Sequence, residues 1–269
     1  MDHPIAIKFG GSTCSVGLWL EDGVELIYNE RGRGFTPSCV AYTDDAILVG
    51  DDALDQQCGN ITNTIYDMKY FIGRKLQDPV VQNGIKAWPF KLCSSESDVL
   101  LVEVMRNGKM HRLLSEEVVG RLLCKMKELA EAYLGDKVSR VVLTAPANFN
   151  DPQRLAVTAA AELAGLKVMY LCSEPFVTVR GCEVPDAPNT DTEKRYVVCK
   201  WGGLSLDVAL LHDEEGILEA IACESADIGG RHLTARLQAH VWEQLQKQAP
   251  YDVRVHASSR LKAFFFLSL

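Results

Sequence analysis

The chain has 269 residues and a net charge of −8, with 47% apolar and 24% charged residues. This length suits one large α/β domain or two lobes, and the apolar fraction is enough to bury a sizeable core. The sequence contains no basic tract, whereas a protein that binds a phosphate backbone needs clustered positive charge. We therefore expect no direct binding to nucleic acid.

Nine cysteines are scattered along the chain, and they form no C-x-x-C pair. Zinc sites need closely spaced ligand pairs, and disulfide frameworks favour short secreted chains. The amino terminus lacks the features of a secretory signal, and no apolar run approaches the roughly 20 residues of a membrane-spanning helix. These features predict a soluble, cytosolic protein with reduced cysteines, no metal site and no contact with a membrane.

The first 28 residues predict a three-stranded β-meander. Ile5, Ile7 and Phe9 alternate with small or polar residues, which is the period of a strand. Gly10-Gly11-Ser12-Thr13 predicts a tight turn, and Asp22-Gly23 is a strong hairpin signal. The predicted strands cover residues 5–9, 16–20 and 24–28.

Residues 41–110 indicate a mixed subdomain of short strands and polar loops, with a helix near Asn63–Ile72. A longer helix follows, for which Ser115 is the predicted N-cap and Gly135 the end. Its predicted buried stripe consists of Val118, Val119, Leu122, Leu123, Met126, Leu129, Ala130 and Tyr133.

A buried strand over residues 141–146 comes next, and Asp151-Pro152 then predicts an N-cap with proline at the first helical position. That helix runs to Gly165, and a strand over residues 167–172 follows it. Helices and strands that alternate at such short spacings favour an α/β fold.

The opening pattern returns after a polar loop with two prolines at residues 183–194. K-F-G-G at residues 8–11 and K-W-G-G at residues 200–203 lie 192 positions apart, and each opens a predicted three-stranded meander. The strands of the second meander are predicted over residues 196–201, 206–211 and 217–223. The sequence therefore predicts two copies of one glycine hairpin.

Such a pair of turns predicts a phosphate site. Two glycines let backbone N–H groups approach a ligand closely, and consecutive amides form an anion-binding concavity. Ser12, Thr13 and Ser205 add hydroxyl donors beside the turns. Either turn alone is more often a simple β-turn, but the matched pair favours a clamp on a polyphosphate. The sequence has neither G-x-x-x-x-G-K-[ST] nor G-x-G-x-x-G, so a Walker ATPase and a dinucleotide fold are unsupported.

Seven ordered strings resemble the nucleotide-binding domain of the seventy-kilodalton heat-shock chaperone family. They are I-K-F-G-G-S-T-C-S-V (7–16), R-G-F-T-P-S-C-V-A-Y (33–42), D-M-K-Y-F-I-G-R-K (67–75), V-V-L-T-A-P-A-N-F-N-D (141–151), C-S-E-P (172–175), K-W-G-G-L-S-L-D-V (200–208) and I-G-G-R-H-L (228–233). The resemblance implies an actin-like ATPase-domain fold with ribonuclease H-like lobes and with ATP, magnesium and potassium in the interlobe cleft. It implies a complete lobe I at residues 1–185, with 41–110 inserted, and a partial lobe II at 186–254.

The resemblance also implies a role for each matching residue. The family-equivalent catalytic residues are Lys69, Glu174 and Asp207. The implied cofactor-binding residues are Gly10, Gly11, Ser12, Thr13, Gly202, Gly203, Leu204, Ser205 and Gly230, together with Lys8 and Lys200.

Lys8 and Lys200 depart from the family's pattern, which has an aspartate two residues before each glycine turn to help organise the metal. The change removes two oxygen ligands from a cation that binds only oxygen, so magnesium is a doubtful cofactor and hydrolysis of ATP is expected to be weak or absent. Leu204 in place of a glycine, and Gly11 in place of a hydroxyl residue, weaken the phosphate contacts further. The lysines either act as substitute cations on the phosphates or simply end solvated strands.

An altered first phosphate strand is similar to the atypical, ribosome-associated branch of this family. That resemblance implies a subunit that pairs with a J-domain protein at the ribosome, serves nascent chains and has little or no ATPase activity. Two alternatives stay open, namely an ordinary ATP-hydrolysing chaperone fragment and an inactive truncated product. A sugar kinase on the same fold lacks support, because T-A-P-A-N-F-N-D is chaperone-like.

The carboxyl-terminal residues depart from the family most. After Arg254 the expected helical, charge-rich pattern fails, and residues 255–269 form a divergent apolar tail. Its run Phe264–Leu267 is too short to cross a bilayer. We expect a truncated or mis-spliced product, or else a tail covered by a partner, and we expect the C-terminal third to be the least stable part.

Overall fold

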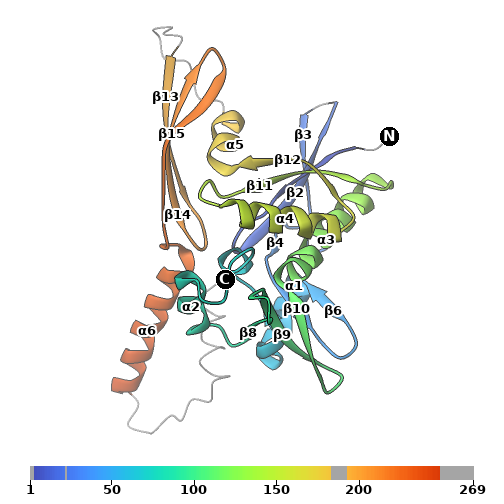
Figure 1. The fold of residues 1–269 in the computed structure, drawn as a ribbon, viewed down its shortest axis with the longest axis vertical. Helices are drawn as coiled ribbons and strands as arrows, with labels where there is room; N and C mark the ends of the chain where they lie inside the picture. Colours follow the sequence, from blue (N-terminus) through green and yellow to red (C-terminus); the bar gives the residue numbers. More distant parts are fainter. Residues whose placement is uncertain (1–2, 22, 183–192, 249–269) are drawn as a thin grey trace.

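A mixed β-sheet organises the first part of the chain (Figure 1). The computed structural model describes residues 3–21, 23–182 and 193–248. The strands of the sheet are β1 Ile5–Lys8, β2 Thr13–Leu20, β3 Gly23–Ile27, β4 Thr36–Pro37, β11 Arg140–Ala145 and β12 Lys167–Ser173. They are ordered β12-β11-β1-β2-β3, and β4 pairs with β2 off this path. Because β1 runs antiparallel to β2 and β2 antiparallel to β3, the first predicted meander is confirmed.

Two helices pack on this sheet and on each other. Helix α3 spans Ser115–Leu134 and contacts β2, and helix α4 spans Asp151–Leu163 and contacts β12. The predicted stripe of α3 is buried as far as Ala130, but Tyr133 is 50% exposed, so that part of the prediction is wrong. Tyr133 lies in the last helical turn, beyond the residues of α3 that pack into the core.

Both helices have N-caps one residue earlier than predicted. Leu114 is the N-cap of α3, and its backbone N–H donates to the Glu117 carboxylate at 2.7 Å, so Ser115 is already helical. Asn150 is the N-cap of α4, where it exchanges side-chain-to-backbone hydrogen bonds with Gln153 at 3.0 and 3.2 Å. This reciprocal capping box satisfies two donors at once, which an Asp151 cap would not do.

The segment between β4 and α3 forms two small sheets, as the prediction of short strands indicated. One consists of β5 Val40–Tyr42, β6 Ile47–Val49 and β7 Thr64–Ile65, and the other of β8 Lys91–Ser94, β9 Leu100–Arg106 and β10 Lys109–Leu114. The helices among them are α1 Asp51–Asp55, α2 Pro79–Ile85 and the 3₁₀ helices η1 Gln57–Gly59, η2 Ile61–Asn63 and η3 Met68–Tyr70.

The helix predicted near Asn63–Ile72 is wrong. Strand β7 pairs with β5 there, and Asp67 adopts a left-handed conformation with φ 59°, which interrupts an α-helix. Tyr66 packs edge-on against Phe90, and Phe71 edge-on against Trp88. This aromatic packing holds a bent segment in place of a helix, with only η3 helical.

A second meander follows helix α5, Glu174–Gly181. Its strands are β13 Glu193–Trp201, β14 Leu206–Glu214 and β15 Ile217–Ala226, ordered β13-β14-β15, so the second predicted meander is also confirmed, with longer strands. Helix α6, Gly230–Gln248, comes after it, and neither α5 nor α6 was predicted. Figure 1 shows this meander standing beside the first sheet, with α5 between them and α6 extending away from the meander.

The second meander packs against helix α5 through apolar side chains. Val198, Ala209 and Leu211 form a small core of the second meander, against which Phe176 of α5 packs. The predicted domain boundaries stay predictions, and most of the loop at 183–194 and the whole tail at 255–269 lie outside the described residues. Within the described ranges, no helix is long and apolar enough to span a bilayer.

Candidate functional site

The two glycine turns meet face to face. A Cβ atom on Gly203 would lie 1.8 Å from Ser12 Oγ, and one on Gly11 would lie 2.6 Å from Leu204 Cδ1. A side chain at either position would therefore have to displace a side chain of the opposite turn, so the two turns are in close contact. Leu204 is only 5% exposed, although it belongs to a turn. The two predicted phosphate turns are brought together, and Leu204 lies between them.

Hydrogen bonds to the backbone also hold each turn in its conformation. A Cβ on Gly10 would lie 2.0 Å from the carbonyl oxygen of Thr13, and Ser38 Oγ donates to the Gly10 carbonyl at 2.8 Å. In the second turn the Gly202 N–H donates to the Ser205 carbonyl at 2.8 Å.

The first residues of α6 hold the second turn. The Gly230 N–H donates to the Gly202 carbonyl at 3.0 Å, and the Arg231 N–H donates to the Gly203 carbonyl at 2.9 Å. Gly230 therefore lies against the second turn.

The three predicted catalytic residues come together with Lys200 in one buried cluster. Lys69 Nζ, from η3, donates to Glu174 Oε1 at 2.8 Å. Lys200, from β13, pairs with the other oxygen of the same carboxylate and lies 3.8 Å from Asp207 Oδ2. The side chains of Glu174 and Asp207 are 5% and 4% exposed, so the charges are largely removed from water.

The other acid of the cluster, Asp207, is held by two hydroxyls. Ser205 Oγ donates to Asp207 Oδ2 at 3.1 Å, and Ser225 Oγ donates to Oδ1. The carboxylate thus keeps its position opposite Lys200, its partner in the β13–β14 register. The sequence analysis missed Ser225, which lies on a neighbouring strand.

Burial acts strongly on the two lysines. The pKa of Lys69 is lowered from 10.5 to about 8. Desolvation is the largest cause and repulsion from Lys8 adds to it, whereas Cys14 and Asp207 act in the opposite direction. Desolvation likewise lowers the pKa of Lys200 to about 8, helped by repulsion from Lys69. The Lys69 side chain is 10% exposed and the Lys200 side chain 25% exposed, and both lysines are still mainly ammonium ions at neutral pH.

Lys8 borders the same cluster but differs from Lys200 in its strand partner and its exposure. The two lysines occupy matching places in the repeated hairpin, but Lys8 pairs in register with Ser15, whereas Lys200 pairs with Asp207. Lys8 is exposed at the end of β1. The sequence analysis treated the two lysines alike, and the structure encloses only one of them.

A second set of contacts, beside the turns, joins α6 and the second turn to the segment around η3. Arg231 of α6 donates to Asp67 Oδ2 at 2.7 Å and lies 4.5 Å from the centre of the Tyr66 ring. Trp88 Nε1 donates to the same carboxylate oxygen at 2.9 Å, and Tyr70 Oη donates to the Leu204 carbonyl at 2.8 Å. The sequence analysis missed these residues, although three of them lie within its matched strings, because no spacing rule joins residues so far apart.

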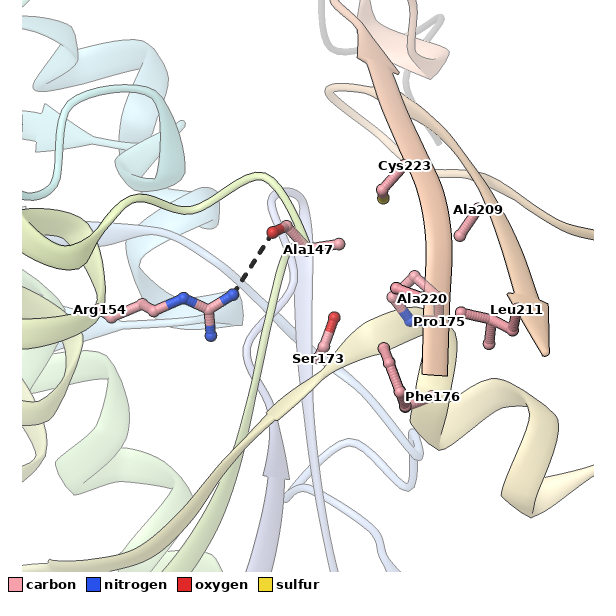
Figure 2. Close-up of a pocket in the computed structure, with 9 residues that line it drawn as sticks. All are labelled: Ala147, Arg154, Ser173, Pro175, Phe176, Ala209, Leu211, Ala220 and Cys223. Carbon is pink, nitrogen blue, oxygen red and sulfur yellow. Dashed lines mark hydrogen bonds between the residues drawn. The ribbon is translucent and has the colours of Figure 1, made fainter. Parts of the chain in front are cut away.

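A pocket of about 230 Å³ lies between the start of α5 and the second meander (Figure 2). Its lining residues are Ala147, Arg154, Ser173, Pro175, Phe176, Ala209, Leu211, Ala220 and Cys223. Most of the lining is apolar, and Arg154 Nη2 donates to the Ala147 carbonyl at 3.4 Å. The sequence analysis did not identify this pocket, because its lining comes from β14 and β15 of the second meander and from β12, α4, α5 and the loop after β11, which are far apart in the sequence.

In this arrangement the residues do not fit magnesium-ATP. Magnesium binds oxygen ligands, but the Lys200 ammonium already lies at both carboxylates that the resemblance assigns as catalytic. Among the residues that the structure describes, no group of three or more His, Cys, Asp or Glu side chains is arranged to hold a metal ion. The space between the two turns contains Leu204 and Ser12.

Comparison with known proteins identifies the family. The family model described as "Hsp70 protein" matches residues 4–263. The chain is 36% identical over 251 residues to heat shock cognate 70 kDa protein 3 of Dictyostelium discoideum, covering 93% of this chain and 40% of that protein. It is 37% identical to heat shock 70 kDa proteins of Trichophyton rubrum and Neurospora crassa, covering 96% of this chain and 39% and 40% of those proteins. The chain spans about two fifths of the length of these relatives, and it belongs to the Hsp70 family.

Proposed function

We propose that this chain is a chaperone subunit that does not hydrolyse ATP and that assists nascent chains in the cytosol, in a ribosome-associated complex with a J-domain protein. The observation that carries the proposal is the Lys200 ammonium, which lies at both Glu174 and Asp207. Membership of the Hsp70 family supports a role in protein folding together with a J-domain protein. The lysine cluster supports the loss of hydrolysis.

The electrostatic reason is simple. Phosphoryl transfer relies on a metal ion to neutralise the charge that develops on the phosphates. A divalent ion about 5 Å from an ammonium group is repelled by roughly 7 kcal/mol at an effective dielectric constant near 20. Lys200 is held in place by its ion pairs, so its charge stays beside the carboxylates. Hydrolysis is therefore expected to be lost, and the subunit would act as a scaffold.

The first experiment measures cleavage of magnesium-ATP by the purified 269-residue chain in a single turnover. We expect no cleavage above that of the Lys69→Ala variant, with Lys86→Ala, an exposed lysine, as the matched control. Cleavage by the wild type and by Lys86→Ala that Lys69→Ala abolishes would contradict the proposal. That result would instead support an ordinary ATP-hydrolysing chaperone, the second candidate, which is favoured by the meeting of Lys69, Glu174 and Asp207 in one cluster.

The second experiment tests the partners. The tagged chain is purified from a lysate under mild salt, and the bound fraction is examined for ribosomal subunits and for a J-domain protein. We expect both to copurify in amounts well above the tag alone. A chain that melts cooperatively but brings down neither would exclude the ribosome-associated role, and a chain without a cooperative melt would support an inactive product.

A further inference from the structure

We infer that the interlobe cleft of this chain is closed by its own side chains, with Leu204 in place of nucleotide phosphate and the Lys200 ammonium in place of the metal ion. The closed arrangement then needs no ligand, and magnesium-nucleotide is excluded until these side chains move. This inference extends the proposed function, in which hydrolysis alone is lost, to the binding step itself.

Leu204 is the first part of the closure. Its side chain packs onto Gly11 of the opposite turn and is 5% exposed, so it fills the concavity that two glycine turns would otherwise leave for an anion. Its carbonyl oxygen is fixed by the Tyr70 hydroxyl at 2.8 Å. A leucine held at both its side chain and its backbone does not leave this space without breaking contacts on both sides of the cleft.

Lys200 is the second part. It reaches from β13 of the second meander to Glu174 at the start of α5, and Lys69 from η3 takes the other oxygen of that carboxylate. A positive group therefore bridges carboxylates from both sides of the cleft, as a bound cation would do. The bridging Lys200 side chain is 25% exposed, whereas the carboxylates of Glu174 and Asp207 are 5% and 4% exposed, so solvent reaches the bridge only from the lysine side.

Arg231 and Asp67 add a third link at a separate point. Asp67 is 2% exposed, and its Oδ2 atom accepts from both Arg231 and Trp88. This ion pair again joins the second meander's helix α6 to the segment around η3. One apolar contact and two ion-pair links thus all hold the two glycine turns against each other.

The experiment restores the residues that a nucleotide site needs. Binding of magnesium-ADP to the purified full chain is measured by calorimetry for the wild type, for Leu204→Gly, for Lys200→Asp and for the double variant. Lys167→Asp, an exposed lysine on β12, is the matched charge control. We expect no saturable binding by the wild type or the control at millimolar ADP, and at least a tenfold gain in affinity for the double variant. A wild type that binds magnesium-ADP at micromolar concentrations, or a folded double variant that gains nothing, would overturn the inference.

A measurement on the wild type alone covers the case in which a variant fails to fold. Amide hydrogen exchange is followed at residues 10–13 and 202–205 with and without saturating magnesium-ADP. We expect these amides to be protected without nucleotide and their exchange to stay unchanged when it is added. Rapid exchange that ADP slows by tenfold or more would show a cleft that nucleotide closes. Binding of magnesium-ADP by a wild type that does not cleave ATP would contradict this inference and leave the proposed function standing. Failure to copurify with ribosomes would contradict the proposed function and leave this inference standing.

Discussion

Glu174 lies between two ammonium groups, and the stability of the cluster depends on it more than on any other member. Each carboxylate oxygen pairs with a different lysine, and the side chain is 5% exposed. Removing one partner of a buried ion pair leaves an uncompensated charge, which costs far more than the loss of a surface pair.

We therefore expect Glu174→Gln to lower the free energy of unfolding by about 3–5 kcal/mol, because the enclosed Lys69 and the partly exposed Lys200 lose their shared counter-ion. Urea unfolding at pH 7 measures the change. Glu162→Gln, on the exposed side of α4, is the control and should change stability by less than about 0.5 kcal/mol. A loss below about 1 kcal/mol for Glu174→Gln would mean that the cluster is open to water.

The lowered pKa of Lys200 predicts that the free energy of unfolding rises at alkaline pH. Its pKa falls from 10.5 to about 8 on folding, so between these values the unfolded chain holds a proton that the folded chain has released. The unfolded state then binds more protons, and the free energy of unfolding rises with pH across that window. We expect wild-type stability to rise between pH 8 and 10 relative to Lys200→Met, which lacks this titration. Urea unfolding at matched pH values tests this, and parallel curves for the two proteins would contradict it.

The sequence predicted the members of the site better than their geometry. The glycine turns, Lys69, Glu174 and Asp207 could be named from the sequence, because they lie in the repeated hairpins and the matched strings. The structure brings them together. The two lysines were expected to behave alike; they lie close enough to repel each other, but their strand partners differ, because Ser15 stands opposite Lys8 where Asp207 stands opposite Lys200. The direction of the Leu204 side chain was not predictable, because it depends on Gly11, which is 193 residues away in the sequence.

Among the elements, strands with alternating apolar residues were predicted well and helix ends less well. The period of two fixes which face of a strand is buried, so both meanders follow from local pattern alone. The segment around Asp67 was mispredicted because packing of distant aromatic residues holds it in a bend. Helix α5 was missed because its eight residues are too few to show a clear helical period.

The start of α4 offers a direct test of which residue caps it. We expect Asn150→Ala to lower the free energy of unfolding by about 1 kcal/mol, because its side chain accepts from the Gln153 N–H at 3.0 Å. Asp151→Ala should cost less, since Asp151 contributes only through the helix dipole. Thermal unfolding monitored by circular dichroism compares the two variants. A larger loss for Asp151→Ala would restore the cap expected from sequence.

For the whole molecule, Arg231 is the link that a single substitution can break most cleanly. We expect Arg231→Ala to leave the buried Asp67 carboxylate with the Trp88 indole as its remaining partner in this contact, and to lower stability by about 2–4 kcal/mol. Urea unfolding gives the loss, and amide exchange should quicken in η3 and in the first turn of α6. Arg236→Ala, an exposed arginine on the same helix, is the control. Equal exchange in both variants would show that Arg231 does not hold the two parts together.

The position of β13 at the end of its sheet has a practical consequence. Among the described residues, the nine-residue strand pairs on one side only, and Val197 and Trp201 are 73% and 60% exposed. The apolar residues lie in its second half, Tyr196–Trp201, and an edge strand with such a stretch is a template for a strand of another molecule. Self-association through this edge would grow with protein concentration, so dilute samples and light scattering belong in any study of the purified chain.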